Sequence, residues 1–331
     1  MEMEKVILTG MRPTGTLHLG HYFGVIPELL KLQNEGSRLF LMIADLHALT
    51  TLKHTKNIGK DSLSLATMYL AAGINPQKST IFIQSQIPEH SELAIILSMI
   101  TPVPMLELNP TYKEMKEETS NLIKNNLGLL AYPVLQAADI LVYKATHVPV
   151  GKDQEPHLEI TREIARKFNS RFGNIFPEPK TILQKESKIF SLQNPDKKMS
   201  KSHGEKTYIS LLDIPEEISK KIKTAVTDSG KEIKYDEKKK PAVSNLLTIY
   251  SLFFEKPIKE IEKIYKDKGY AEFKKDLAEI IINKLAPLQK RFKEIENNPS
   301  LIKSILESGA KEAKKNASQT MEAVKRKIGF V

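Results

Sequence analysis

The sequence predicts an α/β protein in which a doubly wound parallel-sheet domain precedes a mostly helical second domain. In the N-terminal half, short apolar runs alternate with amphipathic segments of helical spacing. After about Ser187 the strand-like runs stop, and every long segment carries helical periodicity. The 331 residues, 40% hydrophobic and 27% charged, are enough for one large or two moderate folded domains.

The expected sheet begins with three short apolar runs, each bounded by polar or turn residues. These runs are Val6–Leu8, Leu39–Ile43 and Ile81–Gln84. Between them, Tyr22–Gln33 and Asp61–Ala72 have the apolar spacing of helices. Strands that alternate with helices imply a parallel sheet covered on both faces, with ligands at the carboxyl ends of the strands.

The second half of the chain is expected to be helical. Its five periodic segments are Glu216–Val226, Pro241–Phe254, Ile258–Lys266, Tyr270–Glu296 and Leu301–Ile328. Asp213 is predicted to cap the first of these helices, with Pro215 at the first helical position.

The composition limits the possible functions. Lys and Arg total 50 against 40 Asp and Glu, a formal charge of +10 that favours an anionic partner such as a nucleic acid. The absence of cysteine excludes disulfides, thiolate metal sites and a cysteine nucleophile. No apolar run is long enough to cross a membrane, and the N-terminus has no secretory pattern, so we expect a cytoplasmic protein.

The first segment with chemical character is Thr9–Gly24, TGMRPTGTLHLGHYFG. A glycine-rich loop that joins a strand to a helix start presents backbone N–H groups and a helix dipole to phosphate. His18 and His21 are three residues apart, so both can project from one side of a first helical turn and donate hydrogen bonds to an α-phosphate. The alternative is an ordinary turn with two surface histidines.

The second segment is Lys197–Ser202, KKMSKS, which follows a probable loop sequence, Asn194–Asp196. Its lysines would supply point charges for a departing pyrophosphate, and its serines would supply short hydrogen-bond donors. By itself, a lysine-rich loop is more often a solvated surface turn.

The two segments occur together far less often than either occurs alone. His18-Leu19-Gly20-His21 and Lys198-Met199-Ser200-Lys201-Ser202 resemble the two signature motifs of the class I aminoacyl-tRNA synthetases. The resemblance implies amino-acid activation with ATP, with Mg²⁺ on the nucleotide and no covalent enzyme intermediate. It also implies that the catalytic residues are His18, His21, Lys198 and Lys201.

Polar residues on one predicted helix indicate the amino-acid site. Tyr132, Gln136, Asp139 and Tyr143 are spaced 4, 3 and 4, so they lie on one face of a helix with apolar flanks. A carboxylate in apolar surroundings needs a hydrogen-bond donor. An indole N–H or a phenol O–H would serve, and Asp139 alone leaves both substrates open.

The surrounding sequence resembles the tryptophan-specific branch of the class, the tryptophanyl-tRNA synthetases, from Thr9 to about Gly329. The segments that carry this resemblance are Val148–Gln154, His157–Arg162, Ala225–Ser229, Asn245–Tyr250 and Gly309-Ala310. It implies that Asp139 accepts the indole N–H of L-tryptophan. The implied tryptophan-binding residues are Asp139, Tyr132, Gln136, Leu8, His47, Val148 and Val150.

The same resemblance implies a set of ATP-binding residues. They are Arg12, Pro13, Thr14, Gly20, His21, Gly151, Lys152, Asp153, Ile189, Lys198, Met199, Ser200, Lys201 and Ser202. Lys113 matches less specifically, and a helix-surface lysine explains it equally well. Many bacterial members carry Asn in place of His21 and Gln in place of Arg12, so the residue that contacts the α-phosphate stays open. His157 and Glu159 are not expected to bind a metal, because a spacing of two places them on different helix faces.

The resemblance also implies a domain plan. Residues 1–187 would form a Rossmann-like catalytic domain and residues 188–300 a helical anticodon-binding domain for tRNA(Trp). The last helix, from about residue 301, would pack back on the catalytic domain, and the protein would be a homodimer. The alternatives are a tyrosine-specific relative, a nucleotidyltransferase of the same fold, and a non-catalytic RNA-binding paralogue.

Overall fold

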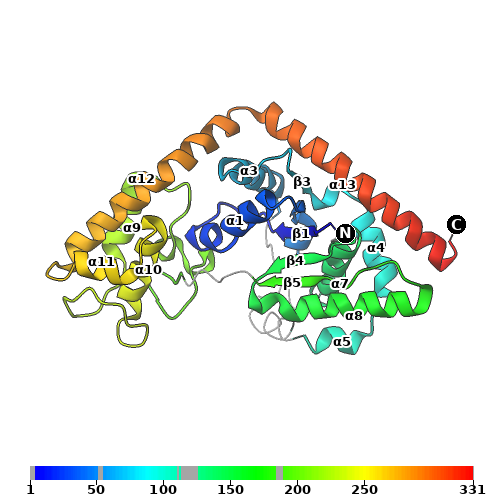
Figure 1. The fold of residues 1–331 in the computed structure, drawn as a ribbon, viewed down its shortest axis with the longest axis horizontal. Coiled ribbons are helices and arrows are strands. Elements are labelled where there is room, and N and C mark those ends of the chain that lie inside the picture. The colour runs from blue at the N-terminus through cyan, green and yellow to red at the C-terminus, as the bar shows by residue number, and fades with distance from the viewer. Residues whose placement is uncertain (1–3, 51–54, 110–111, 113–125, 184–188, 331) are drawn as a thin grey trace. The chain divides into compact units, whose positions relative to one another are not determined.

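A computed structural model describes residues 4–50, 55–109, 112, 126–183 and 189–330 (Figure 1). Lys113 lies outside the described residues. The chain divides into two compact units. The sheet unit contains Met1–Gly15, Leu29–Lys185 and Asn298–Val331, and the helical unit contains Thr16–Glu28 and Glu186–Asn297. The boundary at residues 28–29 falls inside helix α1 (Leu19–Asn34).

The sheet unit is built on five parallel strands in the order β3-β2-β1-β4-β5 (Figure 1). The strands are β1 (Val6–Met11), β2 (Arg38–Ile43), β3 (Ser79–Ile83), β4 (His147–Val150) and β5 (Lys180–Leu183). The chain runs outward from β1 to β2 and β3, then returns to the other side of β1. This reversal beside β1 is the switch point at which doubly wound sheets bind ligands. The predicted α/β class is therefore confirmed.

The three predicted strands are present, and each is extended at one end, to Met11, Arg38 and Ser79. Gln84 does not belong to β3 but starts the 3₁₀ turn η1 (Gln84–Gln86). Strands β4 and β5 were not predicted from the sequence. Both have only four residues, too few for a periodic pattern, and β4 contains a proline.

Helices cover both faces of this sheet. Those of the sheet unit, besides α1, are α2 (Asp45–Ala48), α3 (Ile58–Ala71), α4 (Glu89–Ser98), α5 (Val103–Glu107), α7 (Leu127–Leu141), α8 (Glu155–Phe172) and α13 (Pro299–Ile328). On one face, Leu8, Phe40 and Phe82 form a continuous apolar core with residues of α4, α7, α8 and α13. The side chains that alternate with them along β2 point to the other face, where α3 packs.

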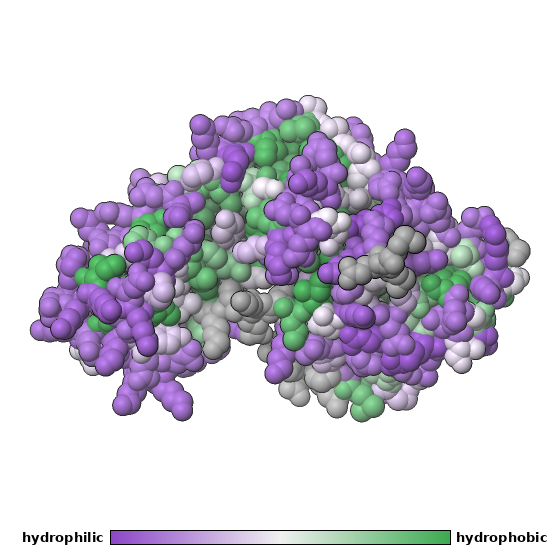
Figure 2. All heavy atoms as spheres, in the orientation of Figure 1, coloured by the Kyte–Doolittle hydropathy of each residue, from purple (hydrophilic) through white to green (hydrophobic). Residues whose placement is uncertain are grey.

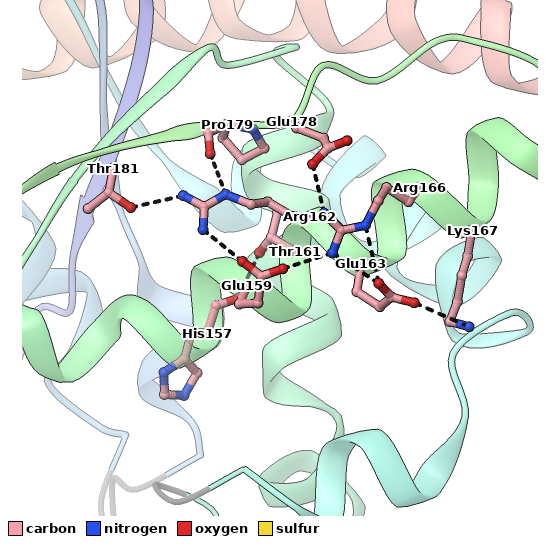
Figure 3. A network of polar contacts seen from close by, with 10 residues as sticks. All are labelled: His157, Glu159, Thr161, Arg162, Glu163, Arg166, Lys167, Glu178, Pro179 and Thr181. Atoms are coloured by element: carbon pink, nitrogen blue, oxygen red, sulfur yellow. Dashed lines mark hydrogen bonds and ion pairs between the residues drawn. The ribbon is translucent and has the colours of Figure 1, made fainter.

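Two arginines tie helix α8 to the segment that leads into β5 (Figure 3). Arg162 donates to the Pro179 carbonyl at 2.8 Å and to the Thr181 hydroxyl at 2.9 Å. Arg166 pairs with Glu178 at 2.7 Å. The ion pair of Arg166 is exposed and contributes little to stability, but the Arg162 bonds fix the register of the edge strand against its helix.

The helical unit is formed by four helices in the second half of the chain and by the start of α1. The four are α9 (Pro215–Thr224), α10 (Pro241–Phe254), α11 (Ile258–Ile264) and α12 (Tyr270–Glu296). The predicted bounds of α10 and α12 agree with the structure. The predicted cap of α9 is wrong. Ile214 occupies the cap position, and the Asp213 carboxylate instead accepts from the Ser210 N–H at 2.9 Å and pairs with Lys221.

Hydrophilic side chains cover most of the face seen in Figure 2, in keeping with the charged fraction of 27%. Within the described parts of the chain, no helix has the length and apolar character needed to span a membrane.

Candidate active site

The carboxyl edge of the sheet carries a row of polar residues. Arg12 follows β1, His47 lies in the short helix after β2, Gln84 follows β3, and Asp153 follows β4. Because all strands are parallel, these loops emerge from the same edge of the sheet. Several of the predicted site residues therefore meet there.

Asp139 of α7 is the buried charge of this edge, with 2% of its surface exposed. The Gln84 amide donates to both of its carboxylate oxygens, at 2.8 and 2.9 Å. His90 Nδ1 lies 2.5 Å from Asp139 Oδ1, and His90 Nε2 lies 2.8 Å from the Tyr143 hydroxyl. Asp139 and Tyr143 were expected from the sequence, but their partners Gln84, in η1, and His90, in α4, were not.

Tyr132 and His47 lie beside this group. The Tyr132 hydroxyl is 2.5 Å from His157 Nε2, and the Tyr132 and His47 ring centroids are 5.4 Å apart. Figure 3 shows that the His157 ring projects away from the arginine network on the same helix. His157 is therefore a buried partner of Tyr132, and Ile160, Ile164 and Phe168 form the core face of α8.

Burial controls the charge of these side chains. It raises the pKa of Tyr132 to about 12, with the positive charge of Arg12 opposing the rise. It lowers the pKa of His47 to about 4, although the Asp139 carboxylate acts in the other direction. Near neutral pH the phenol therefore keeps its proton and the His47 imidazole is neutral.

The apolar residues predicted for the tryptophan site differ in exposure. Leu8 and Val148 are almost fully buried on the neighbouring strands β1 and β4 and belong to the apolar core. Val150 and Gln136 are only partly buried.

The turn after β4 has a tight local geometry. A Cβ added at Gly151 would lie 2.6 Å from Asp153 Oδ1, so a larger residue there would have to displace the Asp153 carboxylate. The Gln154 amide donates to Asp153 Oδ2 at 2.8 Å and orients an otherwise exposed carboxylate, and Lys152 is also exposed. In the loop after β1, Pro13 is buried and the Thr14 N–H donates to the Arg12 carbonyl at 2.9 Å.

Both signature motifs lie in the helical unit, where His18 is buried. His18 Nδ1 accepts the Gly20 N–H at 3.1 Å, and the His18 and His21 rings are 3.8 Å apart. Burial first, then the neighbouring charges of His21 and Lys201, lower the pKa of His18 to about 3. His18 is therefore neutral, and because Nδ1 is an acceptor, its proton is on Nε2.

The lysine loop begins in a small antiparallel hairpin, in which Lys198 and Met199 pair with Ile189 and Phe190. Phe190 forms a β-bridge with Lys198, and the Met199 N–H donates to the Ile189 carbonyl at 3.1 Å. Ile189 and Met199 are buried, which leaves the lysine ends at the surface of the loop. Ser200 caps the 3₁₀ turn η3 (Lys201–His203) and contacts the Ser202 hydroxyl at 2.8 Å.

Asn245 of α10 holds the other strand of this hairpin. It accepts the Phe190 N–H at 2.8 Å and donates to the Phe190 carbonyl at 3.0 Å. Asn245 carried part of the sequence resemblance, but its contact with residue 190 gave no sequence signal. Gln84 did give one, because it is the last residue of a predicted strand, whereas nothing in the sequence distinguished His90.

The predicted site residues thus form two groups. Asp139, Tyr132, His47 and Arg12 lie near one another in the sheet unit, and His18, Gly20, His21, Met199 and Lys201 lie near one another in the helical unit. One group offers a buried acceptor beside a protonated phenol. The other offers a neutral N–H donor and lysine ammonium groups, which suit a polyphosphate.

Comparison with known proteins gives consistent results. Residues 2–286 match the family described as tRNA synthetases class I (W and Y). The chain is 42% identical over 330 residues to the tryptophan–tRNA ligase of Caldanaerobacter subterraneus subsp. tengcongensis, covering 99% of each. It is also 42% identical to the tryptophan–tRNA ligase of Bacillus anthracis, covering 98% of each.

Solved structures agree. The tryptophanyl-tRNA synthetase of Mycoplasma pneumoniae matches with a TM-score of 0.86 and 32% identity, over 99% of this chain and 98% of that one. That of Campylobacter jejuni, complexed with ADP and tryptophan, matches with a TM-score of 0.85 and 36% identity, over 98% and 99%. A tyrosyl-tRNA synthetase from Archaeoglobus fulgidus, 21% identical with a TM-score of 0.67, shares the fold.

Proposed function

Because this chain belongs to the class I tRNA synthetases for tryptophan and tyrosine, we propose that it is a tryptophan–tRNA ligase. It activates L-tryptophan with ATP. A carboxylate oxygen of tryptophan attacks the α-phosphorus, the bond from that phosphorus to the oxygen bridging the α- and β-phosphates breaks, and pyrophosphate leaves. A terminal ribose hydroxyl of tRNA(Trp) then attacks the adenylate carbonyl and releases AMP. The tyrosine-specific and non-catalytic alternatives are not favoured by relatives of this identity and coverage.

The buried Asp139 carboxylate is the group to which we assign recognition of the indole. Gln84 and His90 both approach Asp139 Oδ1, while among the described residues Oδ2 has one donor, Gln84. In our proposal Oδ2 accepts the indole N–H, and Tyr132 and His47 border the substrate. Tyr132 is protonated near neutral pH because burial raises its pKa to about 12, so it can donate a hydrogen bond to the bound amino acid.

The α-phosphate is assigned to the histidine motif. A neutral His18 with its proton on Nε2 is a fixed donor, and it needs no change of protonation as negative charge builds in the transition state. The positive end of the α1 dipole, close to Gly20, adds to this stabilisation.

Pyrophosphate is assigned to Lys198 and Lys201, with Ser200 and Ser202 as short donors. Catalysis then rests on positioning and electrostatic stabilisation, without a protein nucleophile. We propose that Mg²⁺ is carried by the phosphate oxygens of ATP, whose charge it partly neutralises. Among the described residues no group of three or more His, Asp or Glu is arranged to hold a metal ion.

We assign the remaining ATP contacts to the loops of the sheet unit. Arg12, Pro13 and Thr14 follow β1, and Gly151, Lys152 and Asp153 follow β4, the two strands beside the switch point. The oriented Asp153 carboxylate suits a ribose hydroxyl.

We propose that residues 188–300 form the domain that recognises the anticodon. Residues 1–187, with the last helix packed on them, would form the catalytic domain. The excess of ten positive charges suits a tRNA partner. Because tRNA is charged where translation takes place, we place the enzyme in the cytoplasm.

We further propose a homodimer. Five apolar side chains between α4 and the start of α7 are more than half exposed, and surfaces of this kind mark protein interfaces. They are Ile95, Met99, Val103, Leu108 and Leu127.

ATP–pyrophosphate exchange tests the central proposal. The wild-type protein should catalyse exchange with L-tryptophan and discriminate strongly against L-tyrosine. The Asp139→Asn substitution keeps the side-chain shape but places an N–H₂ group among donors, so kcat/KM for tryptophan should fall by about 100-fold or more. Exchange supported by tyrosine alone, or by no amino acid, would refute the proposal.

A further inference from the structure

Two side chains of the sheet unit bind the Asp139 carboxylate and connect it to two other elements. Gln84, from η1, and His90, from α4, are both fully buried. Gln84 also accepts the His47 N–H at 3.1 Å through Oε1. The amide oxygen of Gln84 therefore faces α2, and its N–H₂ group faces Asp139.

The proton positions in the group follow from the Asp139 carboxylate, which only accepts hydrogen bonds. His90 therefore carries a proton on Nδ1, and Nδ1–H donates to Asp139 Oδ1 at 2.5 Å. The Tyr143 hydroxyl lies 2.8 Å from His90 Nε2. Burial, Asp139 and Glu89 all raise the pKa of Tyr143, so its hydroxyl keeps its proton and can donate to this nitrogen.

The aromatic core holds this chain of hydrogen bonds in place. The Tyr143 ring stacks on Phe40 with centroids 4.6 Å apart and meets the edge of Phe82 at 5.5 Å. The tyrosine therefore cannot turn its hydroxyl away from His90 without disturbing the packing of the sheet.

The bonds leave the two carboxylate oxygens unequal. Within the part of the chain that the structure describes, Oδ1 accepts from Gln84 and His90, whereas Oδ2 accepts from Gln84 alone. A carboxylate oxygen has room for two acceptor interactions, so Oδ2 keeps one lone pair for a ligand N–H. A rotated carboxylate would lose the His90 bond, at a high cost in a buried site.

We propose that His90 is a positioning residue for amino-acid selection: held by Tyr143, it locks the Asp139 carboxylate so that Oδ2 faces the indole N–H. The inference rests on the proposed function and goes beyond it, because it assigns substrate selectivity to a residue of α4 that need not touch the substrate. The effect of His90 should then depend on the N–H group of the ligand.

The test compares two substrates and two substitutions. L-tryptophan is compared with β-(benzothiophen-3-yl)alanine, in which sulfur replaces the indole N–H. The Asn amide nitrogen occupies a position similar to Nδ1 of histidine, whereas the Gln amide nitrogen lies near the position of Nε2. His90→Asn therefore keeps the donor to Asp139, and His90→Gln removes it.

For His90→Gln we expect kcat/KM for tryptophan to fall by about 100-fold, mainly through KM, with a change of about threefold or less for the sulfur analogue. For His90→Asn we expect tryptophan use within about fivefold of wild type. His147→Asn is the matched control, because His147 lies at the amino end of β4, away from the carboxyl edge. Circular dichroism checks that each variant is folded.

Equal losses for both substrates would assign His90 a structural role only, and unchanged tryptophan use in His90→Gln would also overturn the proposal. If His90→Gln fails to fold, Tyr143→Phe decides, because it removes only the hydroxyl that holds His90 Nε2. It should again reduce tryptophan use more than analogue use, and equal effects would overturn the proposal. A wild-type protein that activates neither substrate would instead refute the proposed function.

Discussion

Buried histidines are the residues on which both groups of the site depend. His18 offers a fixed N–H donor because the Gly20 N–H occupies its other nitrogen. His90 and His157 contact the side chains of Asp139 and Tyr132. A buried imidazole is a useful positioning group because it has two nitrogens, and satisfying one determines whether the other donates or accepts.

The pH dependence of stability follows from His18. Its folded-state pKa, about 3, lies below its ordinary value of 6.5. As pH falls below 6.5 the unfolded chain takes up a proton that the folded chain rejects, so stability is lost toward pH 4. For one histidine the free energy of unfolding should fall by at most about 1.4 kcal/mol per pH unit.

Urea unfolding at pH 7, 6 and 5 measures this loss. His18→Asn keeps an acceptor for the Gly20 N–H but cannot be protonated, so its stability should fall less steeply with pH than that of the wild type. His203→Asn, which removes an exposed histidine of the same unit, is the control. Parallel curves for His18→Asn and wild type would contradict the assignment.

At the scale of single elements, two contacts position the parts of the site. One is the pairing of Asn245 on α10 with the hairpin of residues 189–199. The other is the close approach of α13 to β3, the edge strand of the sheet. An edge strand covered by a helix cannot pair with another chain.

Removing Asn245 should disorder the lysine loop without affecting the tryptophan site. We expect Asn245→Ala to lower kcat for pyrophosphate exchange by about tenfold or more, with KM for tryptophan nearly unchanged. Stability should fall by about 1–2 kcal/mol, because two backbone groups lose their partner. The kcat and the stability of Asn245→Asp, which keeps only the acceptor, should lie between those of the wild type and those of Asn245→Ala. A normal kcat in a folded Asn245→Ala protein would show that the hairpin does not need this anchor.

Gly309 is the point at which α13 meets the sheet. A Cβ added there would lie 1.8 Å from the Ile81 carbonyl oxygen, so Gly309→Ala must push the helix away from β3. We expect a loss of about 1–3 kcal/mol in the free energy of unfolding. Gly59→Ala in α3 is the matched control, because a methyl group there meets nothing within 4 Å. Equal stability of Gly309→Ala and wild type would refute the close contact.

At the scale of the whole molecule, the chain combines a parallel sheet with a helical unit that carries both signature motifs. The helical unit includes Thr16–Glu28, which is distant in sequence from the rest of that unit. His18 and Lys201, separated by more than half of the chain, are therefore neighbours in one compact unit.

The proposed homodimer gives the prediction at this scale. Met99→Glu places a charge at the carboxyl end of α4, where 74% of the methionine surface is accessible. Sedimentation at micromolar concentration should show monomers for this variant and dimers for the wild type. Ile264→Glu, at an exposed apolar residue of the helical unit, should remain dimeric. A wild-type monomer, or a dimer unaffected by Met99→Glu, would exclude this surface as the interface.

The sequence by itself determined the first three strands, the bounds of α10 and α12 and the identity of the family. Hydrophobic periodicity and short motifs are local properties, because each is a pattern of residues close together in the sequence. For the same reason it missed β4 and β5, which are too short to show a period. It also assigned Asp213 as a cap, although that carboxylate found partners at Ser210 and Lys221.

Only the tertiary structure decided how Asp139 is held. The sequence picked out the carboxylate, since a charge among apolar helix residues is unusual. It could not show that Gln84 and His90, about 50 residues earlier, would satisfy it. Such bonds depend on the packing of α4 and α7 against one sheet. The order of residues along the chain does not show which side chains this packing brings together.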